Sequence, residues 1–128
     1  MGNHRWMIEK VLGDALDLGK QVENTAKARY ARPSPYVTDP SLNAGGVRVD
    51  VGGAHQSYPS SHTVDAGVGL ALLRPLDPHL GSEYDWMADE VAYSRLYGGG
   101  HYLSDVTAGM FLGTLVGDYE RRKAGLPS

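Results

Sequence analysis

The sequence predicts an all-α domain, a single helical bundle of about four helices with one long irregular loop. Four stretches carry apolar residues at helical spacing with charged or polar residues between them. A fifth stretch, Tyr36 to Pro59, is rich in glycine and proline and keeps no period. A chain of 128 residues can bury about two-thirds of its unfolded surface. We therefore expect residues 1–128 to form one domain.

The four expected helices are bounded by capping residues, glycines and prolines. The first ends before Pro33, because a residue that precedes proline is disfavoured in the α region. Serines cap the second, which stops at Arg74-Pro75, and the third presents an apolar face that includes Trp86. Small residues along the fourth helix predict close packing against a neighbour: Ala108, Gly109, Gly113 and Gly117. The expected ranges are Met7–Tyr30, Thr63–Leu73, Ser82–Arg95 and His101–Lys123.

Within the long loop, Val47–Val51 alternates between apolar and polar residues and could form a short strand. An ordered loop with one extended piece is the simpler expectation. Irregular segments of this length are usually functional in a compact domain.

Composition excludes several classes of function. The net charge is −3, and acidic and basic residues are mixed, so no nucleic-acid partner is expected. The absence of cysteine excludes disulfides, thiolate catalysis and cysteine zinc sites. Met1–Lys10 lacks the apolar core of a signal peptide. The longest apolar stretches, Ala66–Leu73 and Val106–Val116, are too short and too rich in glycine to span a bilayer, so we expect a soluble chain without a transmembrane segment.

The stretch from Ser94 to Asp105 combines an arginine, three glycines, a histidine and an aspartate. If a helix starts at His101, Asp105 lies one turn later on the same face and can hold one imidazole nitrogen. Arg95 supplies a planar set of donors that suits phosphate. These residues indicate phosphoryl chemistry, although a histidine–aspartate pair of this spacing is also common on helix surfaces.

The stretch Pro59-Ser60-Ser61-His62 precedes the second expected helix. The start of a helix offers free backbone N–H groups and the positive end of the helix dipole to an anion. Ser60 and Ser61 add hydroxyl groups, and His62 is placed to protonate a leaving group. The alternative is an ordinary helix cap.

Together these stretches resemble the three-part signature of the type-2 phosphatidic acid phosphatase superfamily, Lys-x6-Arg-Pro, Pro-Ser-Gly-His and Ser-Arg-x5-His-x3-Asp. The third part is complete from Ser94 to Asp105, and the second is present with Ser61 in place of glycine. The first is Lys27, six residues and then Ser34-Pro35, with serine in place of arginine. The resemblance runs from about Gly13 to about Val116. Thr25–Tyr36 is particularly similar to the soluble bacterial class A non-specific acid phosphatases.

The resemblance implies a phosphomonoesterase that needs no metal or other cofactor and acts on a small phosphorylated substrate. His101 would be the nucleophile that forms a phosphohistidine, Asp105 would orient its ring, and His62 would protonate the leaving alcohol and later activate water. The groups implied to hold the phosphoryl oxygens are Lys27, Ser60, Arg95 and the backbone N–H groups near Ser61. Vanadate could occupy the same site as a phosphate mimic. The resemblance also implies a periplasmic or secreted protein, whereas the lack of a signal peptide leaves a cytoplasmic one open.

The departures from the signature produce their own expectations. Ser34 removes a bidentate phosphate clamp. Arg32 could substitute in part, or could form a salt bridge or face solvent. The side chain of Ser61 could crowd a bound phosphate. Because relatives usually carry further helices before the lysine, we expect either a minimal version of the family domain or a fragment whose exposed apolar helix faces need a partner. We therefore expect a homodimer.

Four alternative functions remain open at this stage. A vanadium-dependent haloperoxidase shares the anion site, and a non-catalytic phosphate-binding module would explain the lost arginine. A metal site is a third possibility, because two His and two Asp residues have ligand-like spacing: His62, Asp65, His101 and Asp105. A plain helical domain is the fourth, but it leaves the three spaced motifs unexplained.

Overall fold

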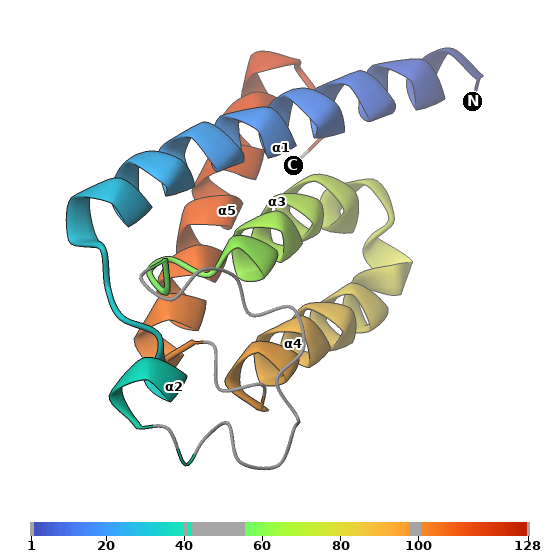
Figure 1. Ribbon diagram of the computed structural model, residues 1–128. Coiled ribbons are helices and arrows are strands. Elements are labelled where there is room, and N and C mark those ends of the chain that lie inside the picture. The colour runs from blue at the N-terminus through green and yellow to red at the C-terminus, as the bar shows by residue number, and fades with distance from the viewer. Residues whose placement is uncertain (1, 40, 42–55, 98–100, 128) are drawn as a thin grey trace.

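The structure is a computed structural model that describes residues 2–39, 41, 56–97 and 101–127. Within these residues it contains helices and no strand, so the all-α prediction is confirmed (Figure 1). The region in which Val47–Val51 was expected to extend lies outside the described residues. Four long helices are joined by a short helix and a 3-10 turn. The elements are α1 (Gly2–Tyr30), α2 (Pro35–Thr38), α3 (Ser61–Leu76), η2 (Pro78–Leu80), α4 (Gly81–Tyr97) and α5 (Leu103–Lys123).

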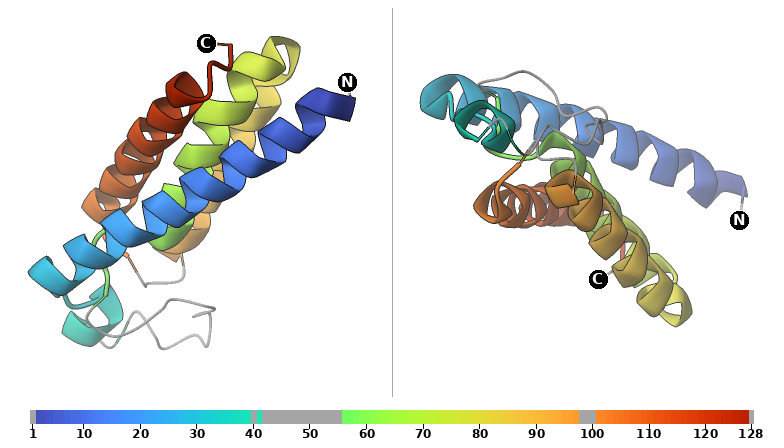
Figure 2. Two further views of the ribbon diagram at one scale, coloured as in Figure 1. Left: turned by 90° about the horizontal axis from the view of Figure 1, so that it is seen from above. Right: turned by 60° about the horizontal axis from the view of Figure 1, so that its bottom comes forward.

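Helices α3 and α5 pack backbone against backbone at the centre of the bundle (Figure 2). A Cβ atom added at Gly113 would lie 2.0 Å from the Val64 carbonyl oxygen. One added at Gly67 would lie 2.6 Å from the Met110 carbonyl oxygen. No side chain could fit at either point, which confirms that the glycines of the last helix permit close approach.

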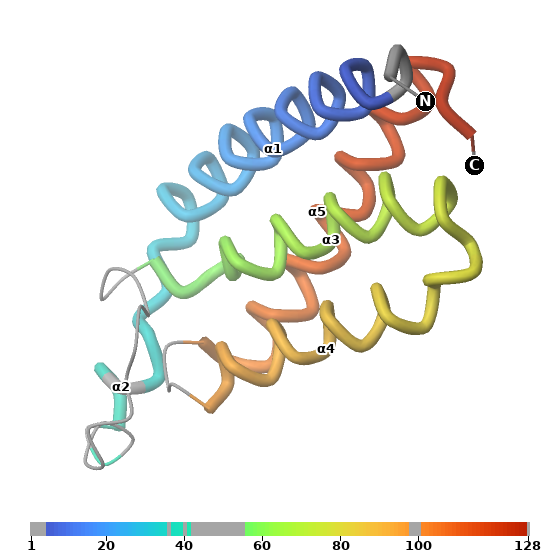
Figure 3. The backbone as a smooth tube through the Cα atoms, turned by 90° about the vertical axis from the view of Figure 1, so that its right-hand side faces the viewer, coloured from blue at the N-terminus to red at the C-terminus, as the bar shows by residue number. Residues whose placement is uncertain are grey.

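Helix α1 crosses over α3 and α5 and closes the core from one side (Figures 1 and 3). Gly19 faces α3, where an added Cβ would lie 3.2 Å from a methyl group of Val64. The buried apolar cluster draws residues from all three helices: Val11, Ala15, Val68, Leu72 and Val116. Burial of apolar surface, at about 25 cal/mol per Å², therefore holds together the helices that carry the motifs.

Helix α4 packs on α3 but buries little of itself. Only Gly81 and Ala88 are buried, whereas Trp86 is 64% exposed and Met87 is 55% exposed. The predicted apolar face of this helix is therefore wrong at Trp86 and Met87, which do not lie against the core. Residues two apart on a helix do not face the same way, so Tyr84 and Trp86 cannot both contact the core.

Six of the eight ends of the long helices differ from the predicted ones, by one to five residues, and three of these differences have a consequence or a clear cause. Helix α1 begins at Gly2, five residues before the expected start. Helix α3 continues through Pro75, because a proline in the last turn removes only its own hydrogen bond, and the Asp77 N–H still donates to the Leu73 carbonyl at 3.0 Å. Helix α5 begins at Leu103, so His101 precedes the helix.

Four helix ends meet at one end of the bundle. The last turns of α1 and α4 lie near the first turns of α3 and α5 (Figures 1 and 3). Each of the three sequence motifs is located at one of these ends or in the segment that leads to it. In the described part of the chain no helix has the length and apolar character needed to span a membrane.

Candidate active site

Backbone and side-chain hydrogen bonds bring the three motifs together. The Ser60 N–H donates to the Asp105 carbonyl at 3.1 Å, which joins the start of α3 to the start of α5. The ammonium group of Lys27 donates to the Pro59 carbonyl at 2.5 Å, which joins α1 to the same segment. The Arg95 guanidinium lies 3.4 Å from His62 Nδ1, which joins α4 to α3.

His101 is 7% exposed, and its Nδ1 lies 2.8 Å from the Ser57 carbonyl oxygen. A carbonyl can only accept a hydrogen bond, so Nδ1 carries the proton and Nε2 carries the lone pair. Burial lowers the pKa of His101, against smaller opposing contributions from the Ser57 hydrogen bond and Asp105. Burial thus favours the neutral imidazole, whose lone pair lies on Nε2.

Asp105 is fully buried and accepts three hydrogen bonds. The donors are Arg32 Nη1 at 2.8 Å, the Tyr102 backbone N–H at 2.7 Å and the Ser57 hydroxyl. Its nearer oxygen is 3.9 Å from His101 Nδ1, beyond hydrogen-bond distance. The structure therefore differs from the expectation that Asp105 bonds directly to the imidazole ring.

The reason is the helix boundary. Because α5 begins at Leu103, His101 and Asp105 do not share a helical face, and the Asp105 carboxylate instead caps the first turn through Tyr102. Asp105 reaches His101 through Ser57, whose hydroxyl bonds the carboxylate and whose carbonyl bonds the imidazole.

Lys27 fastens the segment that carries Ser57. Its ammonium donates to the Gln56 carbonyl at 2.7 Å and to the Pro59 carbonyl at 2.5 Å. An ammonium has three protons, so one remains for a ligand. Burial lowers the pKa of Lys27, while Glu23 and Asp105 act in the opposite direction.

The first turn of α3 presents its backbone N–H groups at the same place. Ser60 caps the helix, with its hydroxyl accepting from the Thr63 N–H at 3.4 Å. Close packing fixes this turn, because a Cβ added at Gly109 would lie 2.0 Å from Thr63 Oγ1. His62, in the first turn, is exposed and lies near Arg95. The resulting arrangement can hold an anion between two cations and a helix start.

Arg32 and Ser34, the two residues considered in connection with the missing signature arginine, have different environments. Arg32 pairs with Asp105 and also donates to Ser104 Oγ at 2.7 Å, with its guanidinium carbon 4.3 Å from the centre of the Tyr102 ring. It therefore takes the salt-bridge role among the alternatives. Ser34 is fully buried before α2.

Sequence reasoning missed Ser57 and Glu23. Nothing in the sequence marks Ser57, because its carbonyl is common to every residue type. Glu23 is predictable as a neighbour of Lys27, because it lies four residues earlier on the same face of the same helix, and its charge raises the pKa of Lys27.

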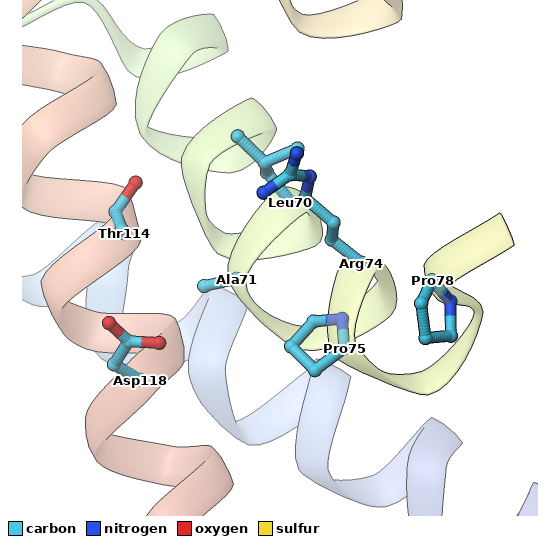
Figure 4. A pocket seen from close by; sticks show the side chains of 7 residues that line it. All are labelled: Leu70, Ala71, Arg74, Pro75, Pro78, Thr114 and Asp118. Atoms are coloured by element: carbon cyan, nitrogen blue, oxygen red, sulfur yellow. The ribbon is translucent and has the colours of Figure 1, made fainter. Parts of the chain in front are cut away.

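Two other candidate sites have less structural support. Among the described side chains, no three His, Asp or Glu residues are placed to hold a metal ion, so the alternative site from His62, Asp65, His101 and Asp105 is not assembled. A groove between α3 and α5 lies away from the motifs and is lined by Arg74 and Asp118 (Figure 4). Arg74 is paired with Asp85 at 3.2 Å and Asp118 with Arg121 at 3.3 Å.

The sequence matches the PAP2 superfamily over residues 14–119, and the chain belongs to this superfamily. A comparison with curated protein sequences finds no match. Membership supports a phosphatase-type activity on phosphoesters.

Proposed function

We propose that this chain is a metal-independent phosphomonoesterase that forms a phosphohistidine at His101, similar in chemistry to the bacterial class A acid phosphatases. The observation that carries the proposal is the hydrogen bond from His101 Nδ1 to the Ser57 carbonyl. It leaves a neutral nitrogen lone pair beside a helix start and two cations. Water-soluble phosphomonoesters are the substrates that we infer for such a site.

The reaction runs in two displacements. His101 Nε2 attacks phosphorus, the P–O ester bond breaks, and protonated His62 gives its proton to the leaving oxygen. Lys27, Arg95, Ser60 and the N–H groups near Ser61 hold the phosphoryl oxygens, where charge is greatest in a loose transition state. Neutral His62 then takes a proton from water, which attacks phosphorus, breaks the P–N bond and releases phosphate.

The test is hydrolysis of a generic aryl phosphate by the intact chain. His101→Ala should lower kcat about a thousandfold or more, because the nucleophile is removed. His79→Ala, at an exposed histidine on η2, is the matched control and should leave activity unchanged. Acid quenching should trap a phosphoprotein in the parent chain and none in His101→Ala.

Other outcomes would contradict the proposal in identifiable ways. Full activity in His101→Ala would show that the reaction does not proceed through a phosphohistidine at His101. Loss of activity with chelator would show a metal requirement. Halide oxidation that depends on vanadate would identify a haloperoxidase instead, and calorimetric binding of phosphate without turnover would identify a binding module.

We also propose a homodimer and a periplasmic or secreted location. The location rests on the resemblance to class A enzymes, and fractionation of the native cells tests it against a cytoplasmic one. The dimer rests on an exposed stripe of α5 that contains Leu103, Phe111, Leu115 and Tyr119, each at least 48% exposed. Spacings of four residues form ridges that a second identical helix can pack into.

A further inference from the structure

Arg32 is a charged residue beside the candidate site that the proposed reaction does not use. Its Nη1 donates to Asp105 Oδ1 at 2.8 Å, and its backbone carbonyl accepts from the Ser57 N–H at 3.2 Å. The Ser57 hydroxyl in turn donates to Asp105 Oδ2. These three hydrogen bonds close a ring that joins the residues after α1, the segment before α3 and the start of α5.

The ring determines how the Asp105 carboxylate is turned. Because Arg32 holds Oδ1, Oδ2 lies toward the Ser57 hydroxyl and toward the Tyr102 N–H, which is 2.7 Å away. Asp105 is fully buried, and Ser57 is 1% exposed. A buried carboxylate that loses its cationic partner leaves an uncompensated charge, which is costly away from water. Arg32 therefore supplies both a countercharge and an orientation to Asp105.

Other contacts hold Arg32 itself in place. Its guanidinium carbon lies 4.3 Å from the centre of the Tyr102 ring, and its Nη1 also donates to Ser104 Oγ at 2.7 Å. The Tyr102 hydroxyl shares a 2.7 Å hydrogen bond with Thr38 Oγ1 of α2. A planar guanidinium can stack on an aromatic face and pair with a carboxylate at the same time. Arg32 is thus held against Asp105, although its side chain is 36% exposed.

The ring reaches His101 through Ser57. His101 Nδ1 lies 2.8 Å from the Ser57 carbonyl oxygen but 3.9 Å from Asp105 Oδ2. Lys27 fastens the chain on either side of Ser57, through the Gln56 and Pro59 carbonyls. Ser57 itself is held by Arg32 and Asp105. The direction of the imidazole therefore depends on the Arg32 ring.

We infer that Arg32 is a positioning residue for His101: by holding Asp105 and Ser57, it aims the imidazole at the phosphoryl group. The inference rests on the proposed function, because it concerns the same nucleophile. The competing role for Arg32 replaces the signature arginine that is absent at Ser34, as a clamp on the phosphoryl oxygens. A clamp contributes to phosphate affinity, whereas a positioning residue contributes to kcat.

Arg32→Met separates the two roles, with kcat measured on an aryl phosphate and the dissociation constant of orthophosphate measured by calorimetry. The kcat should fall about a hundredfold, because a small misplacement of a reacting group has effects of this size, while phosphate affinity should change less than about threefold. Arg32→Lys keeps the charge and a donor for Asp105, so its kcat should stay within about threefold of the parent value.

A double-mutant cycle with Asp105→Asn tests whether Arg32 acts through the carboxylate. In the Asp105→Asn variant, Arg32→Met should lower kcat less than about threefold, because the charge that Arg32 holds is already gone. If Arg32→Met alone does not fold, Arg32→Gln takes its place in the cycle. It is neutral but still donates a hydrogen bond, so its expected loss of kcat is about tenfold.

Arg29→Met is the matched control. Arg29 is an exposed arginine in the last turn of α1, and its guanidinium carbon also lies over a tyrosine ring, 5.8 Å from the centre of Tyr30. The substitution is the same, but Arg29 lies outside the ring of hydrogen bonds described above. It should leave both kcat and phosphate affinity unchanged.

Three results would overturn the inference and leave the proposed function intact, because His101→Ala tests that function separately. They are unchanged kcat in Arg32→Met, a loss of phosphate affinity as large as the loss of kcat, and an equal loss of kcat with and without the Asp105 carboxylate. A parent chain that neither binds phosphate nor hydrolyses the ester would contradict both the inference and the proposed function.

Discussion

Burial and one hydrogen bond set the protonation state of His101, the proposed nucleophile. Burial removes water from the ring and disfavours its charged form, so the pKa falls below the ordinary value of 6.5. The Ser57 carbonyl decides which nitrogen keeps the proton. Both effects come from the surroundings and not from a paired carboxylate.

A pH dependence follows from the lowered pKa of His101. If His101 is the nucleophile as proposed, the free protein keeps it neutral as the pH falls past 6.5, and it becomes charged only when the pH passes through its lower pKa in the folded state. The acid limb of a plot of kcat/KM against pH should therefore lie below 6.5. A limb centred at 6.5 or above would show that burial does not control this group.

Ser34 offers a second prediction, because the superfamily arginine can be restored there. Ser34 is fully buried, so an arginine side chain would have to displace its neighbours. We expect Ser34→Arg to lower the free energy of unfolding by about 1–3 kcal/mol, the usual cost of overpacking. It should bring no gain in kcat/KM. Unchanged thermal stability together with tighter phosphate binding would show that the clamp still fits.

At the level of residues, the motifs predicted which side chains meet but not all of their partners. Spacing in the sequence placed His62, Arg95 and Lys27 at helix ends, and the structure brings these ends together. The prediction that Asp105 bonds directly to the His101 ring is wrong, because it assumed that α5 begins two residues earlier than it does. Ser57 could not be predicted, since a bond to backbone carries no residue signature.

At the level of elements, glycines decide how close α3 and α5 can come. A Cβ at position 113 would collide with the backbone of Val64, whereas a Cβ at Gly13 on α1 would meet nothing within 4 Å. The two positions form a matched pair, because both are helical and both would receive the same methyl group.

Gly113→Ala should lower the free energy of unfolding by about 3 kcal/mol and reduce activity, because α3 and α5 must move apart. Gly13→Ala should raise it by about 0.5–1 kcal/mol through helix propensity alone. Chemical denaturation of both variants checks the pair. Equal effects would mean that packing between α3 and α5 does not limit stability.

Periodicity predicted all four long helices, and the small residues of the last one predicted its close packing. It could not predict the exposure of α4, because burial depends on which helices lie beside it and not on its own pattern. Periodicity also did not predict the start of α5 at Leu103. The glycines before His101 suggested an earlier start, whereas Asp105 caps the helix from its first turn.

At the level of the whole molecule, large apolar side chains remain on the surface of both α4 and α5. Burial of those on α5 in a symmetric pair would remove them from water. Phe111→Glu places a charge in the middle of the proposed interface and should convert the dimer to a monomer in light scattering. Trp86→Ala, at an exposed residue of α4, should remain dimeric. A parent chain that is monomeric at micromolar concentration would contradict the proposal.

The bond between His101 and the Ser57 carbonyl has a consequence for how this protein tolerates mutation. No substitution can delete a backbone carbonyl, so the tautomer of His101, the proposed nucleophile, is protected from side-chain change at the atom that sets it. It is vulnerable only where the segment itself is anchored. Lys27 provides that anchor through the Gln56 and Pro59 carbonyls, so a variant at a residue on α1 can misalign a histidine near the start of α5.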